Sequence, residues 1–144
     1  MLKLRSIFLF VPIFAMLILF AQPLPVISQS TSENLNKEMH EAWEAFKAYA
    51  VDQKQKAVAH GKDLLQKADA RIEELEAKAD KASGETKTRY QKEIKKLQEK
   101  RVNAVQKLDE LENASADGWE SAKEGFTQAY KDLYDAYKEA VEKF

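Results

Sequence analysis

No proline occurs between residues 26 and 144 of this 144-residue chain, and all three prolines lie before that stretch. Proline is the residue that most strongly breaks an α-helix, because it lacks the backbone donor and its ring clashes with the preceding turn. The proline-free stretch is also rich in Ala, Lys, Glu, Leu and Gln, which favour helix. It contains no strand-like alternation of β-branched residues. The sequence therefore predicts an all-α protein.

The apolar residues of this stretch recur at steps of three and four, which is the spacing of a coiled coil. Two series with different phases carry this pattern: Met39, Ala42, Phe46 and Tyr49, then Val58, Gly61, Leu65, Ala68, Ile72, Leu75, Ala79 and Ala82. Between them, residues 52–56 are wholly polar. We interpret the slip of phase as a local stutter within one continuous helix rather than as a helix end.

The clearest break in the helical pattern is Ser83-Gly84-Glu85-Thr86. Gly84 can take the left-handed conformation that ends a helix, and Ser83 or Thr86 can cap the next one. The pattern predicts a long antiparallel coiled-coil helical hairpin over residues 35–144, turning at 83–86. Reflection about Gly84 brings two aromatic segments together at the open end of this hairpin. We expect their side chains to be core or interaction anchors: Trp43, Phe46, Tyr49, Trp119 and Phe126.

Residues 115–118 form a second candidate break, with two readings. Asp117 and Glu120 could cap a separate third helix over Trp119–Phe144, which would fold back on the hairpin. The heptad spacing of Ser115, Gly118 and Ala122 instead favours a helix that continues through Gly118. We expect continuity, with the third C-terminal helix as the alternative.

Residues 1–28 have the order of a secretory signal peptide, with the cations Lys3 and Arg5 followed by an apolar run. That run, Ile7–Ala21, has 15 residues including Pro12, fewer than the about 20 that span a bilayer. Val26 and Ser28 suit a signal-peptidase site, and 29–34 form a polar lead. The chain lacks cysteine, so it cannot carry a lipid on an N-terminal thiol. We expect export to the periplasm or cell envelope, with an uncleaved signal anchor as the alternative.

The charge balance argues against nucleic acid as a partner. The chain has 23 cations and 24 acids; removal of Lys3 and Arg5 leaves 21 cations and a net charge of −3. A mildly acidic, mixed surface does not attract phosphate backbones. The sequence also offers no catalytic, cofactor-binding or metal-binding motif: His40-Glu41 lacks the second histidine of a zinc helix, and His60 has no carboxylate at a useful offset. Both histidines are expected to be exposed, and the protein to be non-enzymatic.

Three segments carry a resemblance to a known family: Ile72-Glu73-Glu74-Leu75-Glu76-Ala77-Lys78-Ala79, Asp117-Gly118-Trp119-Glu120 and Lys123-Glu124-Gly125-Phe126. Over residues 38–133 the chain resembles small bacterial coiled-coil proteins that are labelled stress-response proteins of unknown function. Gly118 departs from the alanine that many members carry at that position. The resemblance implies a helical hairpin and a link to stress, and it brings no catalytic residues.

Three functions follow as hypotheses. The first is an interaction protein of the cell envelope, which binds a protein partner or itself. The second is peripheral binding to a lipid surface through the aromatic segment 119–144, although its four lysines against six acids have the wrong sign for anionic lipid. The third is a holdase chaperone, which the lack of a strong positive charge disfavours.

The first prediction concerns export. N-terminal sequencing of the protein from the envelope fraction should give a mature chain that begins at or near Gln29, because Val26 and Ser28 form the small-residue site that signal peptidase cleaves. Recovery of a membrane-bound chain that still begins at Met1 would show instead that the apolar run serves as an anchor.

Overall fold

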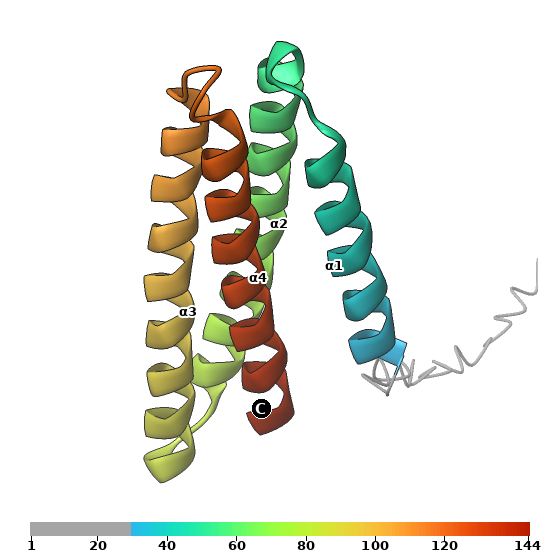
Figure 1. The fold of residues 1–144 in the computed structure, drawn as a ribbon. Coiled ribbons are helices and arrows are strands. Elements are labelled where there is room, and N and C mark those ends of the chain that lie inside the picture. Colours follow the sequence, from blue (N-terminus) through green and yellow to red (C-terminus); the bar gives the residue numbers. More distant parts are fainter. Residues whose placement is uncertain (1–29) are drawn as a thin grey trace, which may run out of the picture.

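The computed structural model describes residues 30–144, and the signal-peptide prediction for residues 1–28 lies outside that range. The described chain forms four α-helices and one short 3-10 turn, with no strand among them (Figure 1). The elements are α1 (Ser30–Ala48), η1 (Val51–Gln53), α2 (Lys54–Lys81), α3 (Gly84–Glu112) and α4 (Trp119–Lys143). The all-α prediction is therefore confirmed, and α1 begins within the expected polar lead.

Successive helices run in opposite directions and pack together as a bundle (Figure 1). The α3 helix packs along both α2 and α4, whereas α1 packs mainly on α4 at the other side of the bundle. Short connections between antiparallel neighbours are typical of this architecture. The α4 helix is therefore covered from two sides, by α3 and by α1.

The stutter expected between residues 50 and 58 is wrong, because the helix ends there. After Ala48 the chain passes through Tyr49 and an extended Ala50 (φ −88°, ψ 167°) into η1, and α2 then runs back antiparallel to α1. The slip in apolar phase thus marks a reversal of the chain. The apolar residues of α1 face α4, whereas those of α2 mainly face α3, so the two series have different phases.

The expected continuity through Gly118 is also wrong. The α3 helix ends at Glu112, and the alternative third C-terminal helix is present as α4. The loop between them is held by local and distant contacts: the Gly118 N–H donates to Ser115 Oγ (3.2 Å), and Lys54 Nζ donates to the Ala114 carbonyl. Gly118, rather than Asp117, occupies the N-cap position of α4. The heptad spacing across this loop was therefore not a sign of helix.

The turn at residues 82–84 joins α2 and α3. Gly84 has φ of +60°, the left-handed region that other residues avoid. Beyond the turn, Arg101 pairs with Asp69 through Nε (2.5 Å) and Nη2 (3.0 Å), and Gln98 donates to Glu76 (2.8 Å). These contacts fix α2 and α3 as antiparallel neighbours.

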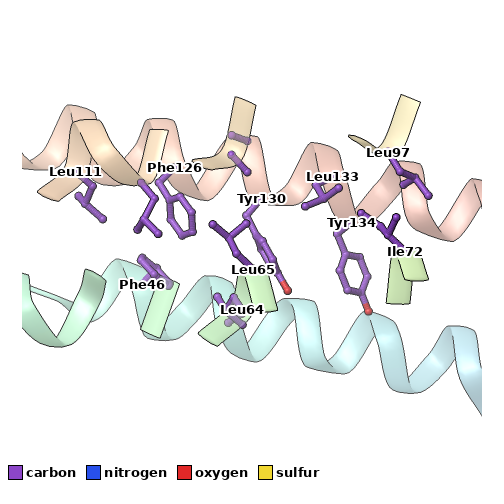
Figure 2. Close-up of a cluster of buried hydrophobic side chains, with 14 of the residues drawn as sticks. Phe46, Leu64, Leu65, Ile72, Leu97, Leu111, Phe126, Tyr130, Leu133 and Tyr134 are labelled. Carbon is purple, nitrogen blue, oxygen red and sulfur yellow. The ribbon is translucent and has the colours of Figure 1, made fainter. Parts of the chain in front are cut away.

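The core is a continuous seam of aliphatic and aromatic side chains from all four helices (Figure 2). All four helices contribute to the largest side chains that are at most 2% exposed: Phe46, Leu75, Leu97, Leu111, Trp119, Phe126 and Leu133. Two of the three aromatic side chains in this set, Trp119 and Phe126, belong to α4, which therefore contributes most of the fully buried aromatic side chains. Burial of such side chains is the main favourable term in folding.

The carboxyl end of α4 is pinned to α3. The ring of Tyr90 stacks on Phe144 with centroids 3.8 Å apart, and its hydroxyl donates to the Phe144 carbonyl (3.1 Å). Buried Glu93 accepts from Lys143 (3.0 Å) and Lys96 (3.4 Å). Burial raises the pKa of Glu93, but these two ammonium groups outweigh it and hold the pKa below its ordinary value. The carboxylate thus stays charged at neutral pH.

Two helix-interior glycines differ in their surroundings, and this generates the second prediction. A Cβ at Gly61 would lie 2.5 Å from Leu108 Cδ1 and 3.2 Å from Phe126, whereas one at Gly125 would meet only Lys107 at 3.6 Å. Alanine is better than glycine in a helix by about 1 kcal/mol. Gly125→Ala should therefore raise the free energy of unfolding by up to about 1 kcal/mol.

Gly61→Ala should be about 1–3 kcal/mol less stable than Gly125→Ala, because the added methyl overpacks the contact with Leu108. Urea unfolding of the two variants measures the difference. Equal gains in stability for the two variants would show that α2 does not approach α3 and α4 closely at Gly61.

Candidate interaction site at the α1–α4 contact

The amino end of α4 supplies hydrogen-bond donors to the carboxyl end of α1. Trp119 Nε1 donates to the Tyr49 carbonyl (3.1 Å), and Lys123 Nζ donates to the carbonyls of Tyr49 (3.0 Å) and Lys47 (3.1 Å). The last carbonyls of a helix lack partners within the helix and carry partial negative charge. Lys123 is 7% exposed, and its ammonium also pairs with Glu120. An ammonium buried at this point is thus compensated by the acceptors around it.

An aromatic cluster lies next to this contact, around Phe46 in the last turn of α1. The ring of Phe46 lies 4.9 Å from that of Phe126, 5.0 Å from His60 and 5.7 Å from Tyr49. Phe46 and Phe126 are buried, Tyr49 is half-buried, and its hydroxyl lies 3.4 Å from His60 Nδ1. The expectation that His60 is exposed is therefore wrong, because it stacks on Phe46; His40 is exposed. Burial lowers the pKa of His60, and Lys67 adds to this against Asp63, so the ring is neutral at pH 7.

Trp43 stands apart from the other expected anchors because it is only half-buried. Lys47 Nζ lies 5.4 Å from the centre of its ring, within cation–π range. Two open hollows of about 330 and 260 Å³ meet at Trp43 between α1 and α4. We call them together the Trp43 groove; its walls are Asn36, Met39, His40, Trp43, Lys47, Glu120, Lys123, Glu124, Thr127, Lys131, Tyr134 and Asp135. The groove combines apolar surface with charges of both signs.

A third feature lies further along α4, where Tyr134 and Tyr137 surround Arg71 of α2. The guanidinium lies 5.9 Å and 5.8 Å from the two rings and pairs with Glu38 of α1. Burial raises the pKa of Tyr134, and it raises that of nearby Tyr130 to about 12 against the opposing charge of Arg71. Both phenols thus stay protonated at neutral pH. The cluster joins α1, α2 and α4 but offers no ionised nucleophile.

The five anchors expected from the sequence thus separate into two groups. Phe46, Trp119 and Phe126 are buried, with Tyr49 at their edge, and they come together around the carboxyl end of α1. Trp43, the fifth expected anchor, is half-buried and lines the groove. Lys123 was not identified from the sequence as part of this site. Its position four residues after Trp119 and three before Phe126 was the only signal that it lies on the inner face of α4.

Residues 30–144 contain no group of three or more His, Asp or Glu side chains placed to hold a metal ion. Among the helices of that part of the chain, none combines the length and the apolar character that crossing a bilayer requires. Comparison with protein-family models, with curated proteins and with solved structures gave no match. The resemblance to stress-response proteins therefore stays a prediction.

The two tryptophans generate the third prediction. Trp119→Ala should lower the free energy of unfolding by about 3–5 kcal/mol, because it empties a packed aromatic site and removes a donor from the end of α1. Trp43→Ala should cost about 1 kcal/mol or less, because that side chain is half-exposed on the groove. Chemical unfolding of both variants checks this, and a larger loss for Trp43→Ala would place Trp43 in the core.

Proposed function

We propose that this chain is a non-enzymatic exported protein that acts in the cell envelope by binding a protein partner. The Trp43 groove is the proposed contact surface, and Trp43 is its central side chain. Tryptophan is among the side chains most enriched at binding hot spots, because it buries a large area with few rotatable bonds. A role in the response to stress is part of this proposal and rests on the resemblance alone.

One observation carries the preference for protein over lipid: the apolar face of α4 is buried against the other helices of the bundle. Trp119, Phe126, Tyr130, Leu133 and Tyr134 are each at most 4% exposed in the bundle. A helix that binds a lipid surface must present its apolar face outward. Trp43, by contrast, stays partly in contact with solvent between α1 and α4, within a groove of mixed charge.

Peripheral lipid binding is the second candidate, favoured by the aromatic content of α4. It requires α1 to leave α4, so that the face containing Phe126 and Tyr130 becomes free. The excess of acids over lysines in this helix opposes binding to anionic headgroups. The two candidates thus differ in whether the bundle stays closed when it binds.

We also propose that α2 and α3 pack as an antiparallel coiled coil, the finer form of the hairpin expected from the sequence. The support is the 3–4 spacing of Leu65, Ile72 and Leu75, which are buried in the core, together with the packing of α2 along α3. The Asp69–Arg101 pair beside this seam is the kind of flanking ion pair that sets the register of such helices.

The fourth prediction tests the groove in cells. A photo-crosslinking amino acid at His40 or Lys47, on the rim of the groove, should give discrete adducts with an envelope protein, and Trp43→Ala should abolish them. The same amino acid at exposed Gln91 on α3 is the matched control and should give no such adduct. Adducts that are equal at all three positions, or that survive Trp43→Ala, would remove the groove as the binding surface.

Flotation with liposomes separates the second candidate from the first. The mature protein should stay with the soluble fraction for both neutral and anionic vesicles. Flotation that persists in Trp43→Ala and is lost in Phe126→Ser would instead transfer the function to α4 and the lipid surface.

A further inference from the structure

The segment that reverses the chain between α1 and α2 contains no residue that requires a turn. Tyr49-Ala50-Val51-Asp52-Gln53 has neither glycine nor proline, and no non-glycine residue of the described chain has positive φ. Reversals between helices are usually marked by such residues. The local sequence is therefore compatible with a helix that runs straight on from α1 into α2.

Contacts from α4 maintain the bend. In a continuous helix the carbonyls of Lys47 and Tyr49 would accept the N–H groups of Val51 and Gln53, four residues ahead. In the structure Lys123 and Trp119 of α4 donate to these carbonyls, and the Gln53 N–H donates to Ala50 instead (2.9 Å). In the bent form the carbonyls of Lys47 and Tyr49 thus accept from side chains of α4, and in the straight form they would accept from backbone N–H groups of the same helix.

We propose that residues 49–53 are a hinge, and that in the straight form α1 packs on α4 of a second copy of this chain. Straightening joins α1 and α2 into one helix over residues 30–81, about 78 Å long. Such a helix carries α1 beyond the end of its own bundle, because α1 and α2 meet at one end of the molecule (Figure 1). Two copies related by a two-fold axis at the hinges would then exchange their α1 helices, which is a domain-swapped dimer.

A second copy is the occupant that the observed contacts specify. Leaving α4 exposes the buried face of α1, with Leu35, Ala42 and Phe46, and the matching surface of α4. A second copy presents the identical surface, together with the partners of Glu38 and Asn36 on α2 and α4, namely Arg71 and Lys138. The side-chain contacts between α1 and its neighbours are therefore restored between copies, whereas the carbonyls of Lys47 and Tyr49 at the hinge change their donors. The inference goes beyond the proposed function and does not depend on it, because the Trp43 groove is formed in both arrangements.

Two substitutions at Val51 shift the hinge in opposite directions. Val51 is 41% exposed, so neither change removes much packing. Val51→Pro fits the first position of the turn, after an extended Ala50, but disrupts a continuous helix. It should lower the dimerisation constant at least about 100-fold. Val51→Ala favours helix and should raise the constant several-fold, up to about tenfold over two hinges.

The chain has no cysteine, so single cysteines report where α1 lies. Asn36→Cys in one copy and Lys138→Cys in another are mixed, unfolded, refolded together and treated with a short bismaleimide. The side chains of these two residues are 3.0 Å apart in the structure, across α1 and α4. A product that joins an Asn36→Cys chain to a Lys138→Cys chain, in excess of the control below, requires α1 of one copy to lie on α4 of the other. The matched control pairs Asn36→Cys with Val102→Cys, which is exposed on α3.

We expect the two-chain product from the Asn36 and Lys138 mixture, more of it with Val51→Ala or Lys123→Met, and none with Val51→Pro. Sedimentation of the same samples should show the matching monomer and dimer. The proposal is overturned if Val51→Pro and Val51→Ala crosslink equally, if the Val102 control crosslinks as strongly, or if Val51→Ala and Lys123→Met both stay monomeric at millimolar concentration. Because Val51→Pro leaves the closed monomer intact, its circular dichroism shows that a lost product reflects the hinge and not unfolding.

Discussion

The arrangement of this bundle depends on the hydrogen bonds that Lys123 and Trp119 give to the carboxyl end of α1. An ammonium is costly to bury unless acceptors surround it. Here the acceptors are the carbonyls of Lys47 and Tyr49 and the carboxylate of Glu120. These bonds locate the end of α1, and with it the reversal of the chain into α2. The placing of Phe46 against Phe126 and of Trp43 on the groove follows from that one junction.

The remaining polar contacts have a different role from this junction. The Asp69–Arg101 pair lies partly in solvent, as does the Lys62–Glu112 pair, and such pairs contribute little to stability on their own. They are better regarded as fixing which helices are neighbours. Stability comes chiefly from the apolar seam, in which α4 contacts both α3 and α1.

Sequence reasoning predicted the helices well and their connections poorly. Composition and the spacing of residues such as Leu65, Ile72 and Leu75 predicted an all-α chain, and Gly84 marked the turn between α2 and α3. The reversal at Tyr49–Gln53 was missed, because that segment carries no strong local signal. The break before Trp119 was a candidate, with a separate C-terminal helix as the alternative to the continuous helix that was expected. Both are maintained by contacts with residues distant in sequence, of which Lys123 is the main example. A lysine in a charged helical sequence gives no indication that it is buried, so the site was only partly predictable.

The pairing of α1 with α4 has a consequence for the order in which the protein is made. Asn36 and Lys138 meet across this contact although they are 102 positions apart in the chain. A ribosome makes α1 before the other helices and α4 after them, whereas α2 and α3 meet their partners almost at once. Until α4 is complete, the apolar face of α1 that contains Leu35 and Phe46 lacks the helix on which it mainly packs. Closing so long a loop is slow compared with forming the α2–α3 pair. The newly made protein therefore passes through a stage in which its first helix is available to any other apolar surface nearby.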